Sequence, residues 1–201
     1  MATAEALRTV PLSAAGTRNL LEYPWCRELV HRLRANETLG ALLPSSLVAV
    51  QCTYFDKTED RNWLVALHQD LSIPVAEPVN HRDLGAWSRK EGQHFVQAPV
   101  ELLQELVAVR IHLDDCGTDN GPLRVVPGSH RHGRLSEQAA RGLRDADGEV
   151  ICAIPAGGAL VMRPLTLHAS SKASSPRHRR VLHFLFGPAS AGFGLRWQHA
   201  V

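Results

Sequence analysis

Hydrophobic and polar positions divide the chain into a helical start and a longer part with the period of strands. Apolar residues recur every three to four positions from Leu21 to Leu33, which predicts one helix with a single buried face. Pro24 fits the first turn of this helix, where its missing N–H leaves no partner unsatisfied. A second short turn is expected up to Leu43. Residues 1–16 are weakly patterned and are predicted to form an irregular arm.

From residue 47 onward, β-branched and aromatic residues indicate strands. Within Val107–Leu113, apolar residues alternate with Ala108, Arg110 and His112, which is typical of a strand with two different faces. The predicted strands are 47–55, 62–70, 71–75, 107–113, 122–130, 151–154, 159–169, 180–186 and 195–198. The absence of β-α-β alternation favours a mostly β, antiparallel sandwich or barrel with helices packed outside it.

Three segments interrupt this pattern. A helical turn is predicted at 100–106 and a surface helix at 135–143. The stretch Glu77–Pro99 is long, polar and rich in Pro and Gly, without clear periodicity. A loop of this length is usually functional or disordered, so it is expected to be either a lid over a site or a loosely packed surface insertion.

Composition narrows the class of protein. With 201 residues, 44% hydrophobic and 21% charged, residues 1–201 are expected to form one globular domain. The formal net charge of +2 gives no overall field for nucleic acid or an anionic membrane. No signal-peptide pattern or membrane-length apolar run is present. The four cysteines form no Cys-x-x-Cys motif, which favours reduced thiols in a cytoplasm.

The sequence holds 11 histidines and three His-x-Asp triplets, at residues 68–70, 81–83 and 112–114. Side chains two residues apart share one face of a strand, so this imidazole and carboxylate can reach one ion. Such ligands suit a divalent metal with open coordination positions, as in the 2-His-1-carboxylate sites of non-haem Fe(II) oxygenases. A hydrogen-bonded structural histidine is the alternative for each triplet.

Context favours the first triplet. His68 and Asp70 end an apolar strand, whereas the triplet at 81–83 lies in the polar loop. The triplet at 112–114 also ends a strand and remains a rival, although Asp114 begins a stretch typical of a turn, in which its carboxylate would bond backbone amides. The third ligand is predicted to be His168, near the end of the apolar segment 159–169.

The basic run 177–180 leads directly into a predicted core strand. At least one of these side chains is therefore expected to point inward. A buried guanidinium requires a partner, and a dicarboxylate cosubstrate would supply one, because arginine offers a planar fork to a carboxylate. The alternative is a solvated patch.

Four stretches in this order resemble the phytanoyl-CoA dioxygenase family of Fe(II)- and 2-oxoglutarate-dependent oxygenases. They are His68-Gln69-Asp70, Asp119–Leu123 running into Pro127–His130, His168–Ser171, and Arg179-Arg180 before the last core strand. They span about Gln51 to Phe186. The resemblance implies a double-stranded β-helix, a jelly-roll or cupin-like barrel, with flanking N-terminal helices.

The resemblance also assigns roles. It implies that His68, Asp70 and His168 bind and activate iron, and that Arg179 and Ser170 hold the distal carboxylate of 2-oxoglutarate. Gln51 matches a further cosubstrate contact. Arg110 departs from the family pattern, because some members of the family carry an aromatic residue near the cosubstrate at this position. A carboxylate at position 70 favours hydroxylation over the halogenation of related enzymes that carry Gly or Ala.

The expected function is therefore that of a cytoplasmic Fe(II)- and 2-oxoglutarate-dependent dioxygenase, monomeric, which uses O₂ to hydroxylate a small molecule and releases succinate and CO₂. Arg110 and His112 share a strand face and are expected either to line the cavity or to form a buried structural pair. One rival function is a non-catalytic cupin-like module that binds a metal or ligand. The other is a nucleic-acid binder that uses 177–180, which the near-neutral charge disfavours.

Overall fold

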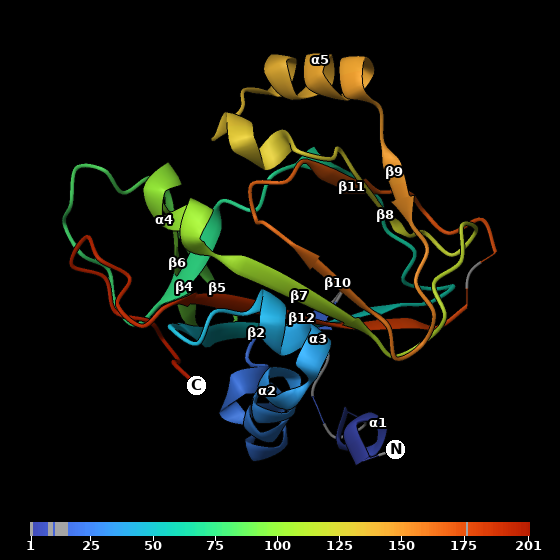
Figure 1. Ribbon diagram of the computed structural model, residues 1–201, viewed down its shortest axis with the longest axis horizontal. Coiled ribbons are helices and arrows are strands. Elements are labelled where there is room, and N and C mark those ends of the chain that lie inside the picture. The colour runs from blue at the N-terminus through green and yellow to red at the C-terminus, as the bar shows by residue number, and fades with distance from the viewer. Residues whose placement is uncertain (1, 8–9, 11–15, 176) are drawn as a thin grey trace.

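Two antiparallel sheets face each other, and helices pack outside them (Figure 1). The computed structural model describes residues 2–7, 10, 16–175 and 177–201. The larger sheet consists, in order, of β1 (Gly16–Thr17), β2 (Leu47–Lys57), β12 (Arg179–Pro188), β7 (Val107–His112) and β10 (Ala159–Met162). The smaller sheet consists of β3 (Val65–His68), β11 (His168–Ser170), β8 (Leu123–Val125) and β9 (Val150–Cys152). The predicted mostly β, antiparallel architecture is confirmed.

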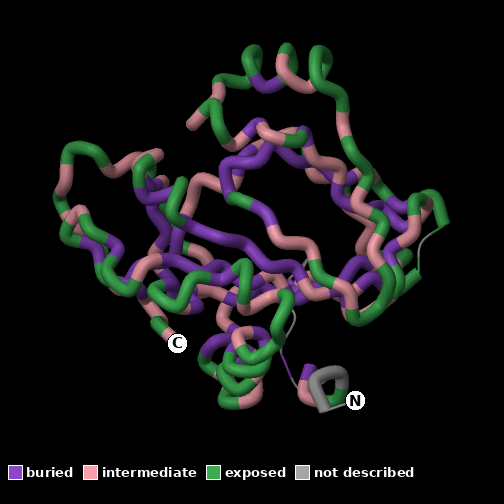
Figure 2. The backbone as a smooth tube through the Cα atoms, in the orientation of Figure 1, coloured by how far each residue is buried: buried purple, intermediate pink, exposed green. Residues whose placement is uncertain are grey.

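The larger sheet has an apolar outer face and a mixed inner face, and its central strands are largely buried (Figure 2). On β7, Val107 and Val109 pack into the same core as Phe184 and Phe186 of β12. The residues between them, such as Arg110, point toward the smaller sheet. This alternation is the one predicted for 107–113, and it separates the structural face of the sheet from the face that can carry chemistry.

The N-terminal helices cover the outer face, below the larger sheet in Figure 1. A 3-10 helix η1 (Leu20–Glu22) precedes α2 (Pro24–Ala35) and α3 (Glu37–Leu42), and α2 has its proline in the first turn, as predicted. Cys26, Val30 and Leu33 of α2 are buried against the strands. Part of the predicted irregular arm is instead helical, as α1 (Ala2–Leu7), while residues 8–9 and 11–15 lie outside the described residues.

The predicted strand 159–169 is wrong, because this segment forms two strands in different sheets. The chain leaves β10 at Met162, turns, and enters β11 at His168. Pro164 lies in the turn, where its missing N–H cannot serve a sheet ladder, and Thr166 N–H closes the turn onto the Arg163 carbonyl at 2.9 Å. The register assumed for one continuous strand therefore does not apply to His168.

The segment Glu77–Pro99 is not the unstructured loop predicted. It contains a hairpin of β5 (Trp87–Lys90) and β6 (Gln93–Gln97), and β6 also pairs with β4 (Ser72–Val75). Glu91 and Gly92 at the tip both have positive φ, which is typical of a type I′ hairpin turn. No period-two signal marked this strand, because β5 is largely exposed and polar.

Two helices agree with the predictions: α4 (Val100–Glu105) and α5 (Glu137–Asp147), whose N-terminus is capped by Ser136. The predicted strand 122–130 is shortened to β8, and a 3-10 helix η2 (Ser129–His132) stands where that strand was expected to end. Near the C-terminus, the predicted strand 195–198 is reduced to one bridge between Val75 and Trp197. None of the helices in the described ranges has the length and apolar content that a membrane span requires.

The ion pair between Asp114 and Arg180 fixes the end of β7 against β12. Arg180 donates to the Asp114 carboxylate from its backbone N–H and from its guanidinium, at 2.8 and 2.6 Å. Asp114 therefore accepts from a backbone amide, as predicted, but that amide belongs to Arg180 on β12 and not to the turn that follows Asp114. Burial raises the pKa of Asp114, but these hydrogen bonds outweigh that effect and hold it below its usual range.

We expect Asp114→Asn to lower the free energy of unfolding by about 2 kcal/mol at pH 7, because hydrogen bonds to a charged group are lost. Since the folded pKa is depressed, the contribution is present above the unfolded pKa of about 4 and disappears as the pH falls through the folded pKa. Urea unfolding of both proteins at pH 7 and at low pH tests this. Asp145→Asn, in an exposed pair with Arg144, should change stability little at either pH, and an equal loss in the two variants would contradict the argument.

Candidate metal and cosubstrate site

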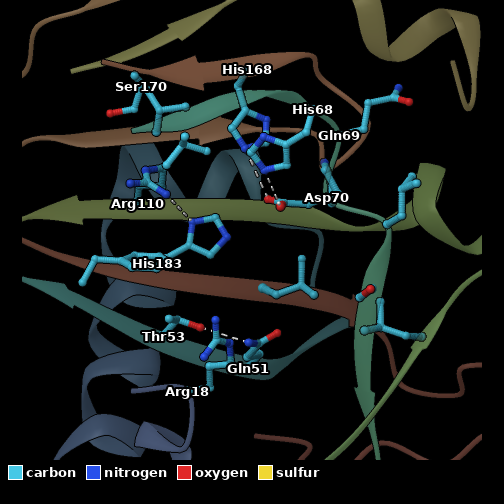
Figure 3. A pocket seen from close by; sticks show the side chains of 18 of the residues that line it. Arg18, Gln51, Thr53, His68, Gln69, Asp70, Arg110, His168, Ser170 and His183 are labelled. Carbon is cyan, nitrogen blue, oxygen red and sulfur yellow. Dashed lines mark hydrogen bonds and ion pairs between the residues drawn. The ribbon is translucent and has the colours of Figure 1, made fainter. Parts of the chain in front are cut away.

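Two imidazoles and one carboxylate converge between the two sheets (Figure 3). His68 at the end of β3 is paired directly with His168 at the start of β11, so their rings lie side by side with centroids 4.2 Å apart. Asp70 follows β3 and faces both rings, at 3.4 Å from His68 Nε2 and 3.7 Å from His168 Nε2. The three groups offer ligand atoms within 4.8 Å of one another, which is close enough to contact one cation.

Backbone carbonyls set the orientation of both rings. His68 Nδ1 lies 2.8 Å from the Ala66 carbonyl, and His168 Nδ1 lies 2.9 Å from the Thr166 carbonyl. A carbonyl only accepts, so each Nδ1 carries a hydrogen, and each Nε2 faces the Asp70 carboxylate. Metal-binding histidines are commonly fixed in this way by an outer hydrogen bond.

The pKa values of this cluster favour the protonation states that bind a cation. Burial raises the pKa of Asp70, but the hydrogen bond from His68 and the nearby imidazoles outweigh burial and hold it well below its usual range. Burial lowers the pKa of His168, although Asp70 opposes this effect. An ionised carboxylate beside a buried neutral imidazole is the donor chemistry that a divalent metal requires.

Gln69 lies between two of these residues in the sequence, but its side chain is held by backbone groups outside the cluster. Its amide donates to the carbonyls of Gly133 and Leu165 at 2.8 and 2.7 Å, and its oxygen accepts from Leu135 N–H at 2.9 Å. Asp70 N–H also donates to the Pro164 carbonyl. The chain between the two side chains is therefore tied to the turn that leads into β11.

The other two triplets do not form comparable clusters. His81 and Asp83 lie 3.7 Å apart in the partly exposed segment before the hairpin, with no further metal-type side chain grouped with them among the described residues. His112 is buried with its Nδ1 unpaired, and its neighbour Asp114 is engaged by Arg180. Geometry thus favours the first triplet over its rivals.

Arg179 is a buried guanidinium near the metal-type cluster. It is 3% exposed, and no described carboxylate forms an ion pair with it. Its Nη1 donates to the Gly121 carbonyl, which also accepts from the Ser170 hydroxyl at 2.9 Å, while its Nε has no partner. Gly121 has φ of 62°, and a Cβ there would lie 2.8 Å from Lys57 Nζ. This crowded pocket presents unsatisfied positive charge to an anion.

One cavity of about 450 Å³ joins these groups. Its lining includes all six residues singled out from the sequence, namely His68, Asp70, His168, Arg179, Ser170 and Gln51. Gln51 donates to the Thr53 hydroxyl at 2.9 Å on the floor of the cavity, in the lower part of Figure 3. The cavity also has Arg110 in its lining, whereas His112 lies outside that lining.

The sequence reading missed His183 and Lys90 in the wall of the cavity. His183 is paired with Arg110 across β12 and β7, and its Nδ1 lies 3.1 Å from Arg110 Nη1. A signal for His183 was available, because the apolar face of β12 holds Leu182 and Phe184, so His183 must face inward. No comparable signal existed for Lys90, since its strand was not recognised.

The run 177–180 does not form one surface. Arg179 is buried and Arg180 pairs with Asp114, whereas Arg177 is exposed and lies 3.3 Å from Asp119. This arrangement agrees with the expectation that one side chain of the run points inward.

Comparison with known proteins places these features in a family. The family model for phytanoyl-CoA dioxygenase (PhyH) matches residues 5–181. No curated protein sequence matches the chain.

Solved structures share the fold at low sequence identity. EvdMO1 is 22% identical over 88% of this chain, with a TM-score of 0.63. EctD from S. alaskensis with bound Fe is 18% identical over 91% of this chain, with a TM-score of 0.64. A structure of the same EctD with 2-oxoglutarate and 5-hydroxyectoine gives 17% identity over 88% of this chain and a TM-score of 0.62.

This chain spans only part of those proteins, 36% of EvdMO1 and 60% of the iron-bound EctD. The likeness nevertheless confirms the expected double-stranded β-helix fold. Because the family model covers most of the sequence, the chain belongs to the phytanoyl-CoA dioxygenase family.

Proposed function

We propose that this protein is a non-haem Fe(II)- and 2-oxoglutarate-dependent dioxygenase that hydroxylates a small molecule and releases succinate and CO₂. The observation that carries the proposal is the convergence of His68, Asp70 and His168 in the same cavity as the unpaired guanidinium of Arg179. A metal site alone would not require that buried cation.

The donor set fits a ferrous ion. Two imidazole nitrogens and one carboxylate form a facial set that leaves positions open for other ligands. His68 and His168 would bind through Nε2, since their Nδ1 atoms are held by backbone carbonyls. Asp70 would supply the negative charge, and bound iron with 2-oxoglutarate would supply the oxidation of a C–H bond by O₂.

The polar pocket fits the far carboxylate of 2-oxoglutarate. Arg179 has a buried Nε with no partner, and the Ser170 hydroxyl lies against the same Gly121 carbonyl. A carboxylate there would neutralise the guanidinium and accept its free hydrogen. Gln51, on the neighbouring strand, is proposed as a further contact to the cosubstrate. The choice of iron as the metal and of 2-oxoglutarate as the cosubstrate is supported by the EctD structures that contain them.

Succinate formation tests this function directly. The protein is incubated with ferrous ion, ascorbate and 2-oxoglutarate in air, and succinate is measured by mass spectrometry. We expect slow succinate formation that requires both iron and O₂, even without a primary substrate. Binding of metal without any succinate, including with a panel of small acids, amides and amines, would favour the non-catalytic cupin-like module instead.

A further inference from the structure

The cavity carries more positive charge than iron and 2-oxoglutarate would use. Its lining contains four cationic side chains, Arg18, Lys90, Arg110 and Arg179, but only one carboxylate, Asp70. The charges of a ferrous ion and of the 2-oxoglutarate dianion cancel each other. Asp70 would then offset Arg179. With iron and 2-oxoglutarate bound, the net charge of the cavity therefore depends on whether the other three cations have carboxylate partners.

Arg18 has its own partner outside the cavity lining. Its guanidinium and its backbone N–H each donate to the Glu91 carboxylate at 2.8 Å. Thr17 donates to the same carboxylate at 2.7 Å. These contacts fasten the tip of the β5–β6 hairpin to the segment before η1 and leave Arg18 neutralised.

Lys90 has no such partner. It stands next to Glu91 at the end of β5, and its ammonium lies 4.9 Å from the centre of the Phe95 ring, on the cavity side of the hairpin. Within the described part of the chain, no carboxylate forms an ion pair with it. Because Glu91 fixes the hairpin tip, Lys90 is held at the cavity wall rather than left free in solvent.

Arg110 is the second unpaired cation. It is 8% exposed, projects into the cavity from β7, and lies 5.6 Å from the centre of the Phe55 ring (Figure 3). Its Nη1 contacts the His183 ring, but its Nε has no partner. Burial and Arg179 lower the pKa of Arg110 to about 10, so it remains charged at neutral pH. A buried guanidinium without a carboxylate is unfavourable until an anion arrives.

We propose that the primary substrate is a small molecule with an apolar body and one anionic group, a carboxylate or a phosphate ester, which Lys90 and Arg110 bind. This inference rests on the proposed function, because it assigns Arg179 and Asp70 to the cosubstrate and the metal. Aromatic and aliphatic side chains supply the apolar walls: Phe55, Trp63, Leu71, Ile73 and Phe95. Opposite charge in a partly desolvated cavity selects the anion over its neutral and cationic analogues.

Calorimetric titration of the full chain loaded with Zn²⁺ and 2-oxoglutarate tests this inference, because zinc binds without redox turnover. The probes share one body and differ in charge: 3-phenylpropanoate, 2-phenylethyl phosphate, 3-phenylpropanamide and 2-phenylethylamine. We expect at least one anion to bind about tenfold or more tightly than the amide, and the amine to bind most weakly. The better anion identifies the carboxylate or the phosphate ester as the group recognised.

Variants distinguish the effect of Lys90 and Arg110 on anion binding from the effect of the overall charge of the protein. Lys90→Gln and Arg110→Gln should each reduce the preference for the anion, and Lys90→Glu should reverse it. Arg89→Gln is the matched control, because it removes a charge from the exposed face of the same hairpin and should leave the preference unchanged. Weaker 2-oxoglutarate binding in Arg110→Gln, with unchanged probe binding, would overturn the role given to Arg110.

Failure of this inference is distinct from failure of the proposed function. If Zn²⁺ and 2-oxoglutarate do not bind, the proposed function fails before any probe is added. If both bind but neither anion binds, or the anions bind no better than the amide, the proposed anionic substrate is wrong while the dioxygenase function stands.

Discussion

His168→Ala is expected to abolish ferrous-ion binding and, with it, succinate formation. His168 is 6% exposed and its Nε2 faces Asp70, so its loss removes one of only two nitrogens in the cluster. Loss of an outer hydrogen-bond partner typically weakens a metal site by about 10–100-fold, so loss of a ligand should exceed about 100-fold. Equilibrium dialysis against ferrous ion under anaerobic conditions measures the change in affinity.

In the His168→Ala variant, a loss of metal binding must be distinguished from a loss of the fold. Thermal unfolding without metal reports the fold, whereas the rise in melting temperature on adding Zn²⁺ reports binding, since a ligand at 100 times its Kd stabilises by about 2.7 kcal/mol. His81→Ala is the matched control, because His81 belongs to another His-x-Asp triplet that is partly exposed. A His168→Ala protein that is folded and still binds ferrous ion as tightly as wild type would contradict its role.

Arg179→Gln is expected to weaken 2-oxoglutarate binding by about 100-fold, because two charge-assisted hydrogen bonds to a carboxylate are lost. Glutamine keeps a donor for the Gly121 carbonyl but removes the charge. Metal binding should persist, since Arg179 contacts none of the three proposed ligands. Titration of the zinc-loaded protein with 2-oxoglutarate gives the dissociation constant.

The neighbouring arginine supplies the control for this prediction. Arg177 has a side chain that is 67% exposed and pairs with Asp119 at the surface, so Arg177→Gln should leave the dissociation constant nearly unchanged. If Arg177→Gln weakened 2-oxoglutarate binding as much as Arg179→Gln, the effect would come from overall charge and not from the buried pocket.

Strand alternation allowed much of the fold to be predicted. In β7 and β12 one face is apolar and packs on the helices, so the opposite faces look inward. Alternation therefore put Arg110 and His112 on the inner face, but it left open which of them lines the cavity, and only Arg110 does. The same alternation explains why Arg179 points into the cavity while Arg180 does not. Local pattern works here because both strands are long and lie in the centre of the larger sheet.

Alternation failed where the chain changes sheets or lies at an exposed edge. The segment from β10 to β11 is mostly apolar, and only Arg163 and Pro164 signalled the turn between two sheets. Strand β5 faces solvent and carries polar side chains, so the hairpin that holds Lys90 had no apolar period. The direct pairing of His68 with His168 is a long-range contact, which residue spacing alone cannot fix.

The most direct measurement is an anaerobic titration of the protein with ferrous ion and 2-oxoglutarate, followed by visible absorption spectroscopy. Chelation of ferrous ion by 2-oxoglutarate in a site of this type is expected to give a metal-to-ligand charge-transfer band. We predict the band in wild type and in His112→Ala, and its absence in His68→Ala. A wild-type protein without the band, or a band that survives in His68→Ala but disappears in His112→Ala, would contradict the assignment of the metal site.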